Sequence, residues 1–188
     1  MTDEAFLLRE ATAADLPALA RIDDSFSNEW VLAIARQGGV IEQDIELRWE
    51  RTKPRGSRRN LVFDEAEYRR AERVIAAERD GHIVGTVMLA TAWNTTAAIL
   101  WIAVDVAFRG QGLGRRFVEE AEAYAREHRL RAIQWETQTD NRAAIEFALA
   151  HGFRIAGFHD AFYRNDYLSR QTAPDFRGIA LFLTKAMG

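Results

Sequence analysis

The chain of 188 residues contains no cysteine, only three prolines and only four histidines. The lack of cysteine excludes disulfides, cysteine nucleophiles and thiolate metal ligands, and it fits a reducing compartment. The histidines are scattered and the carboxylates show no ligand spacing, so we expect no metal. No segment reaches the roughly 18 apolar residues of a membrane span, and the N-terminus lacks a basic region followed by an apolar run. We therefore expect a cytoplasmic protein without a membrane partner.

Excess positive charge is also lacking, because the formal net charge is -3. This balance argues against general nucleic-acid binding, and we expect no nucleic-acid partner. Residues 48–59 are the local exception, since basic residues gather there around Pro54 and Gly56. The segment predicts a loop, either solvated or in contact with a phosphate group. Nucleic-acid binding through this loop is an alternative that the sequence leaves open.

The hydrophobic content of 48% is typical of one compact domain, which we expect to span residues 1–188. Turn and cap signals divide its first half. Thr12 is a plausible helix N-cap, Gly38 and Gly39 separate two apolar runs, and Asp80-Gly81 is a strong hairpin signal. The expected elements are strand 6–9, helix 12–22, hairpin strands 30–35 and 40–49, helix 64–73, and hairpin strands 73–79 and 82–89.

The second half alternates strands with helices. An apolar strand at 99–106 leads through a glycine turn into an amphipathic helix, followed by strand 132–137 and helix 141–150, which Asp140 or Asn141 caps. Strands 154–163 and 178–185 complete an α/β fold whose first half is mainly antiparallel. The buried face of the first of these helices is expected to comprise Leu113, Phe117, Val118, Ala121, Tyr124 and Ala125.

The glycine turn is the most informative stretch of the chain. Gly110, Gly112 and Gly114 permit a tight turn and a close ligand approach, and the helix start adds unpaired N–H groups and the positive end of a dipole. Arg109 and Arg115 strengthen the positive field. This pattern favours a bound phosphate group over the alternative that the glycines only permit close packing.

The spacing of the glycines narrows the choice of phosphate ligand. A dinucleotide fingerprint requires G-x-G-x-x-G near the start of a βαβ unit, whereas here G-x-G-x-G lies past the middle of the chain. A P-loop requires Lys and Ser or Thr after its last glycine, but Arg115 and Arg116 follow Gly114. Neither a dinucleotide nor nucleotide hydrolysis is expected.

The turn resembles motif A of the GCN5-related N-acetyltransferases (GNAT), an apolar-x-Val strand followed by R/Q-x-x-G-x-G/A at a helix start. The resemblance implies a mixed central sheet flanked by helices with a splayed motif A strand, and it implies acetyl-CoA as co-substrate. It matches at Ile102, Val104, Arg109, Gly112 and Gly114. The cofactor-binding residues that it implies are Ile102, Val104, Arg109, Gly110, Gln111, Gly112, Leu113, Gly114, Arg115 and Asn141.

Within that superfamily the chain resembles the streptothricin (nourseothricin) acetyltransferases. Two departures from their pattern concern the binding of the acceptor and the general acid. Where those enzymes carry a Glu-Asp pair that suits a polycationic acceptor, this chain has Leu100 and Trp101. Where many GNAT enzymes carry a tyrosine that can protonate the departing CoA thiolate, it has Ala148. The shared landmarks are residues 24–26, 93–94, 109–112, 135–141, 151–153 and Tyr163.

The remaining candidates for chemistry are polar or aromatic residues outside the glycine turn. Glu136 is the candidate base and Tyr163 the candidate acid or substrate contact, although a surface carboxylate and a core tyrosine are the alternatives. Trp93 and Trp101 are expected to line an acceptor pocket, unless they only pack in the core, and His159 is expected to face the ligand.

We expect an N-acetyltransferase that uses acetyl-CoA on a primary amine of a small molecule less cationic than streptothricin. The alternative is a catalytically impaired acyl-CoA-binding protein of the same fold, which the replacements at Leu100, Trp101 and Ala148 suggest. Either a monomer or a homodimer fits the sequence.

Overall fold

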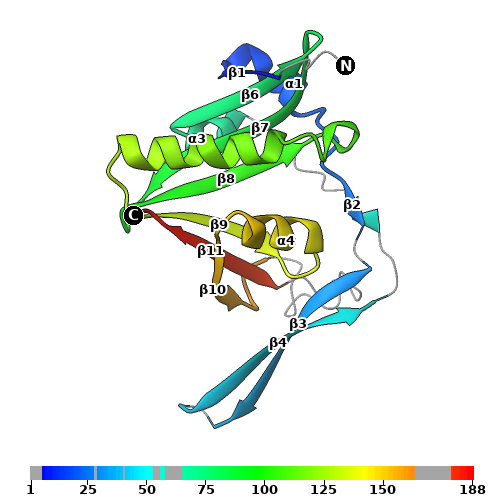
Figure 1. Ribbon diagram of the computed structural model, residues 1–188, viewed down its shortest axis with the longest axis vertical. Helices are drawn as coiled ribbons and strands as arrows, with labels where there is room; N and C mark the ends of the chain where they lie inside the picture. The colour runs from blue at the N-terminus through cyan, green and yellow to red at the C-terminus, as the bar shows by residue number, and fades with distance from the viewer. Residues whose placement is uncertain (1–5, 28, 40, 53–55, 58–64, 164–178) are drawn as a thin grey trace.

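The computed structural model describes residues 6–27, 29–39, 41–52, 56–57, 65–163 and 179–188. Its centre is a seven-stranded sheet in the order β1-β6-β7-β8-β9-β11-β10 (Figure 1). All neighbouring strands are antiparallel except β8 and β9, which confirms the predicted mixed sheet. The strands are β1 (Leu7–Glu10), β6 (Arg73–Arg79), β7 (His82–Ala92), β8 (Thr96–Val104), β9 (Ala132–Gln138), β10 (Arg154–His159) and β11 (Ala180–Ala186).

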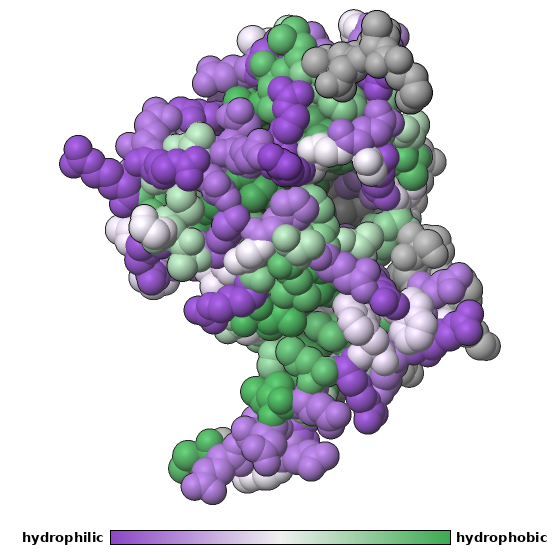
Figure 2. Space-filling model, in the orientation of Figure 1, coloured by the Kyte–Doolittle hydropathy of each residue, from purple (hydrophilic) through white to green (hydrophobic). Residues whose placement is uncertain are grey.

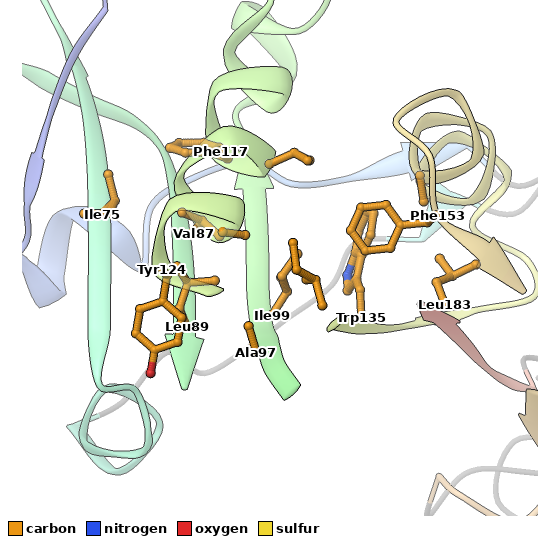
Figure 3. Close-up of a cluster of buried hydrophobic side chains, with 14 of the residues drawn as sticks. Ile75, Val87, Leu89, Ala97, Ile99, Phe117, Tyr124, Trp135, Phe153 and Leu183 are labelled. Atoms are coloured by element: carbon orange, nitrogen blue, oxygen red, sulfur yellow. The ribbon is translucent and has the colours of Figure 1, made fainter. Parts of the chain in front are cut away.

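Helices cover both faces of this sheet. On one face lie α3 (Leu113–Glu127) and α4 (Arg142–Ala150), and the main hydrophobic cluster fills the space between these helices and the sheet. Figure 3 shows Phe117 and Tyr124 of α3 over Val87, Leu89 and Ile99, with Trp135, Phe153 and Leu183 farther along the sheet. The predicted buried face of this helix is confirmed in full.

The opposite face is covered by shorter elements. These are a 3-10 turn η1 (Ala13–Asp15), α1 (Leu16–Leu19) and α2 (Glu65–Arg70). Leu19 and Ile22 pack there in a second cluster with Trp101 and Ala103 of β8.

Several predicted boundaries were wrong. The helix expected over residues 12–22 is only η1 followed by α1, and Asp23 bonds to Asp105 and Val106, just after β8, instead of continuing the helix. The strand expected at 99–106 runs from Thr96 to Val104, since the Asp105 carboxylate accepts from Ala107 N at 3.0 Å and starts a 3-10 turn, η2 (Val106–Phe108). The strand expected at 154–163 ends at His159.

Both predicted hairpins form. β6 and β7 meet at Asp80 and Gly81, whose φ angles of 52° and 74° suit a two-residue turn. The other hairpin, β3 (Trp30–Gly38) and β4 (Gln43–Arg51), lies outside the main sheet and projects from the body (Figure 1). The Arg142 guanidinium lies 5.0 Å and 5.1 Å from the rings of Trp30 and Trp49 and fixes the hairpin base to α4.

A basic loop was predicted at residues 48–59. This prediction is wrong for the first four of these residues, because they form the end of strand β4. Arg48 pairs with Glu50 at 2.6 Å and Arg51 with Glu29 at 3.7 Å, so much of their charge is compensated. Farther on, β5 (Gly56–Ser57) pairs with β2 (Phe26–Ser27), and residues 53–55 and 58–59 lie outside the described residues.

Candidate functional site

The two parallel strands β8 and β9 separate in the middle of the sheet. Only three register pairs join them, Ala97 with Ile133, Ala98 with Gln134 and Ile99 with Trp135, although both strands continue beyond these pairs. A cavity of about 520 Å³ lies where the strands diverge. The predicted splay of the strand before the glycine turn is therefore present.

A bulge in β8 sets which side chains face each side of the sheet. Met88 pairs with Trp101 and Leu89 pairs with Ile99, so Leu100 is an extra residue in β8. Leu100 and Trp101 consequently pack in the second cluster on the α1 face, whereas Ile102 packs against the main cluster under α3. The cavity is lined by residues from both clusters, so it connects the two faces of the sheet.

The glycine turn forms one end of the cavity. Gly110 and Gly112 have φ angles of +75° and +82°, and a Cβ atom at either position would meet no heavy atom within 4 Å. Gly112 is also the N-cap of α3, a helix of 15 residues whose first N–H groups and dipole favour an anion. The turn is open and positively polarised, as a bound phosphate group requires.

Gly114 serves a different purpose from the other two glycines. A Cβ atom there would lie 3.0 Å from the Cε2 and Cζ atoms of Phe147 on α4. The alternative considered from the sequence, that a glycine permits close packing, therefore describes Gly114. It does not describe Gly110 or Gly112.

The basic residues of the turn already have hydrogen-bond partners. Arg109 donates from Nε to the Val104 carbonyl at 3.1 Å and from Nη1 to the Ser25 carbonyl at 2.7 Å. Arg115 pairs with Glu119 at 2.8 Å, and this hydrogen bond raises the pKa of Arg115. Both arginines still line the cavity and contribute positive charge to it.

Most of the predicted cofactor-binding residues come together at this cavity. The exception is Gln111, which is not among the lining residues. Its Oε1 accepts a hydrogen bond from Arg79 Nη1 at 2.7 Å, which links the turn to the end of β6. Asn141 caps α4 through a 3.1 Å bond from Ala144 N and also lines the cavity. The others that line it are Ile102, Val104, Arg109, Gly110, Gly112, Leu113, Gly114 and Arg115.

The two predicted catalytic residues are in contact. Trp135 packs in the main cluster, so its neighbour Glu136 lies on the opposite face of β9, where it lines the cavity. The Tyr163 hydroxyl donates a hydrogen bond to Glu136 Oε1. The structure thus joins a carboxylate and a phenol that are 27 residues apart.

Of the three predicted substrate residues, only Trp101 is among the described residues that line the cavity. Trp101 lines the cavity and is 8% exposed. His159 ends β10 near Phe162, at 6.0 Å between ring centroids, and does not line the cavity. Trp93 precedes Thr96, the start of β8 at the end far from the glycine turn; it is 96% exposed and is not among the described residues that line the cavity.

Asp24, Phe26, Phe147 and His151 are among the residues that line the cavity but were not predicted from the sequence as site residues. Asp24, Phe26 and His151 belong to the shared landmarks, which was the available signal, whereas Phe147 gave none. His151 Nδ1 lies 2.8 Å from the Phe147 carbonyl, which assigns the proton to Nδ1 and leaves Nε2 as an acceptor. Ala148 is fully buried in the main cluster and does not line the cavity.

Among the residues that the structure describes, no group of three or more His, Asp or Glu side chains is arranged to hold a metal ion. Over the same residues, no helix has the length and apolar character needed to cross a membrane.

Comparisons with known proteins agree with the geometry. Residues 41–153 match the model of the acetyltransferase (GNAT) family. Streptothricin acetyltransferase A of Bacillus subtilis (strain 168) is 29% identical over 86 residues, which are 46% of this chain and 50% of that protein. The chain therefore spans about half the length of this curated relative.

Solved structures extend the likeness to nearly the whole chain. A protein described as a streptothricin acetyltransferase, from Bacillus anthracis str. Ames and crystallised with acetyl coenzyme A, is 26% identical with a TM-score of 0.79, over 97% of this chain and all of that one. A nourseothricin acetyltransferase has a TM-score of 0.80 at 23% identity, over 98% and 99% of the two chains, which shows a shared fold. The resemblance predicted from the glycine turn is confirmed.

Proposed function

Because the chain belongs to the acetyltransferase (GNAT) family, we propose that it transfers an acetyl group from acetyl-CoA to a primary amine of a small molecule. The observation that carries this proposal is the cavity between the splayed strands. The glycine turn lies at one end of it, and Glu136, bonded to Tyr163, lies on the other face of the sheet. One ligand in this cavity can contact both.

The residues present fit acetyl-CoA. Gly110 and Gly112 leave open space beside the N-terminus of α3, where the amides would hold the pyrophosphate. Ile102 and Val104 on the splayed strand and Asn141 at the start of α4 would hold the pantetheine arm. When bound, the thioester supplies the acetyl group.

The chain's own residues would then prepare the acceptor. An amine arrives mainly as an ammonium ion and must lose a proton before it can attack, and Glu136, which lines the cavity, would accept that proton. Tyr163 holds the carboxylate through its hydrogen bond; a role for Tyr163 as the acid stays a prediction. Holding both substrates in one cavity removes part of the entropic barrier.

The acceptor is proposed to carry fewer positive charges than streptothricin. The relatives named for that antibiotic suggest an amine acceptor, but Leu100 and Trp101 present an apolar wall to this cavity. Neither side chain can make the charge-assisted hydrogen bonds that several ammonium groups require. We expect little or no acetylation of streptothricin.

Acyl-CoA binding without turnover is the second candidate function. The specific observation in its favour is Ala148, which is completely buried, so this position presents no proton donor to the cavity. A protein of this kind would bind CoA and leave every amine unmodified.

A thiol-release assay with acetyl-CoA and a panel of primary amines, run beside calorimetry with CoA, separates the two functions. Turnover supports the transferase, binding without turnover supports the second function, and failure to bind CoA contradicts both. Gly112→Glu should abolish CoA binding, because its side chain would occupy open space at the turn. Gly39→Glu, also in open space but on the projecting hairpin, is the matched control and should bind normally.

A further inference from the structure

The cavity has a second carboxylate besides Glu136. Asp24 lines it, and the segment around Asp24 is fixed against the end of β8. Val106 N donates to the Asp23 carbonyl at 2.9 Å, and Asp23 N donates to Asp105 Oδ2 at 3.1 Å. On the other side of Asp24, the Ser25 carbonyl accepts from Arg109 Nη1 at 2.7 Å. The backbone on both sides of Asp24 is therefore held by hydrogen bonds, which fixes the position of the Asp24 Cα atom.

Asp24 and Glu136 belong to different walls of the same cavity. Asp24 comes from the chain between α1 and β2, whereas Glu136 comes from β9, across the gap from β8. Trp101 and Phe26 also line this space. A carboxylate beside aromatic walls attracts a cation, since the rings favour positive charge over their faces and apolar surroundings strengthen the attraction.

The two carboxylates, Asp24 and Glu136, are expected to act on different amino groups of the acceptor. The amine that reacts must become neutral, so its nitrogen can attack only after Glu136 has taken a proton. The nitrogen then forms an amide bond as the carbon–sulfur bond of the thioester breaks. Of the two protons that the ammonium form loses in all, Glu136 accepts one and the departing sulfur takes the other. A carboxylate held elsewhere in the cavity suits a group that stays charged.

We propose that Asp24 binds a second cationic group of the acceptor, so that the substrate is a small diamine acetylated at the amino group that faces Glu136. This inference rests on the proposed acetyltransferase function and names its substrate class. It also fits the apolar wall formed by Leu100 and Trp101, because the described residues that line the cavity include two carboxylates, Asp24 and Glu136, which match two amino groups.

The test compares diamines with monoamines of equal length, such as 1,4-diaminobutane with 1-aminopentane, over chains of increasing length. At the best length, the wild-type protein should have a kcat/KM about 10- to 100-fold higher for the diamine, as expected for one charge-assisted hydrogen bond. Asp24→Asn should remove this preference through KM for the diamine. It should lower kcat/KM for the monoamine much less than kcat/KM for the diamine. Asp44→Asn, on the exposed hairpin strand β4, is the control.

Two results would overturn the proposal. One is an equal loss for both amines in Asp24→Asn, which would indicate a structural role, and the other is an undiminished preference for the diamine. If no amine is acetylated, the proposed function fails, but calorimetry of 1,4-diaminobutane with the CoA-bound protein still tests Asp24. Binding that Asp24→Asn weakens at least 10-fold supports the assignment, whereas no binding by the wild type contradicts it.

Discussion

The contact between Tyr163 and Glu136 is the residue-scale feature on which the proposed chemistry depends. Glu136→Gln keeps the shape of the side chain but removes the basic carboxylate. We expect kcat/KM to fall by about 10²- to 10⁴-fold with unchanged affinity for CoA, because the loss is confined to proton transfer. Tyr163→Phe keeps the carboxylate and should cost less. Steady-state kinetics and calorimetry measure both effects.

A surface glutamate provides the control for this experiment. Glu46→Gln, on the exposed part of β4, should have wild-type kinetics. Unchanged activity in Glu136→Gln would remove Glu136 from the mechanism and leave the base to another group that lines the cavity, with His151 the first to test.

A second residue-scale network links Glu72, just before β6, and Thr91, near the end of β7, to α3. Glu72 Oε2 accepts from the Tyr124 hydroxyl at 2.6 Å and from Thr91 Oγ1 at 3.0 Å. The tyrosine hydrogen bond, more than the bonds from Thr91, lowers the pKa of Glu72, while burial and the neighbouring carboxylate raise the pKa of Tyr124. The folded state therefore favours the ionised form of Glu72.

This network predicts a pH-dependent stability. The stabilisation by ionised Glu72 is complete above the unfolded pKa of about 4.3 and is lost as the pH falls through the lower folded pKa. Tyr124→Phe should lower the free energy of unfolding by about 1–2 kcal/mol at neutral pH, and the deficit should shrink below about pH 4. Urea unfolding of both proteins from pH 3 to pH 7 measures this difference.

Tyr68 offers a matched control, because its hydroxyl bonds to a neutral acceptor, the Ala11 carbonyl, at 2.9 Å. The deficit caused by Tyr68→Phe should not depend on pH in this range. A Tyr124→Phe deficit that stays constant down to pH 3 would show that the hydrogen bond does not favour the charged form of Glu72.

At the scale of single elements, the sequence predicted which residues form each strand better than it predicted the register in which two strands pair. The apolar run of β8 identified a buried strand, but a nearly continuous apolar pattern does not show that Leu100 is a bulge or that pairing with β9 stops at Ile99. Those features depend on residues of β7 and β9. The sequence did not show where Trp93 lies for a related reason, since a landmark shared with a family does not indicate the end of the strand at which it lies.

The packing of α3 against α4 is an element-scale feature that the sequence showed only in part. The glycine spacing identified the turn, but only the structure shows that Gly114 accommodates the ring of Phe147. Gly114→Ala should force this ring to move and destabilise the protein by about 1–3 kcal/mol, because an added methyl group overpacks the contact. It should also weaken CoA binding, since Asn141 and Phe147 of this region line the cavity.

A compensating substitution tests this explanation. Phe147→Leu in the Gly114→Ala background shortens the side chain that the new methyl group meets, and it should restore part of the lost stability. Equilibrium unfolding of the two single variants and the double variant forms the cycle. Strict additivity would show that the two residues do not interact.

At the scale of the whole molecule, the sequence predicted the succession of strands and helices along the chain well, since turn signals and periodicity are local, but it did not predict the order of the strands within the sheet. The sequence contained less information about which hydrophobic side chains are exposed at the surface. Hydrophobic residues gather over the lower body and the base of the β3–β4 hairpin in Figure 2, and Ile41 and Ile45 near the hairpin tip are 96% and 52% exposed. An apolar residue in a strand pattern is expected inside, and only the placement of the hairpin beyond the main sheet shows why these two are not.

The sheet as a whole consists of two parts joined by few hydrogen bonds. Strands β1, β6, β7 and β8 form one part and β9, β11 and β10 the other, with three register pairs between them. A ligand in the cavity contacts both parts, so it should act as a bridge. We expect CoA at about 100 times its Kd to stabilise the protein by about 2.7 kcal/mol, which for this length raises Tm by about 5–10 °C.

Hydrogen exchange followed by mass spectrometry locates this effect. Added protection should appear in residues 100–104 of β8 and 136–138 of β9, where the strands have separated, and in the glycine turn between β8 and α3. Gly112→Glu should show neither the rise in Tm nor the protection, because its side chain would fill the end of the cavity that is proposed to hold the pyrophosphate of CoA. Protection restricted to the glycine turn would mean that CoA binds to one part only, and the cavity would then not be the place where donor and acceptor meet.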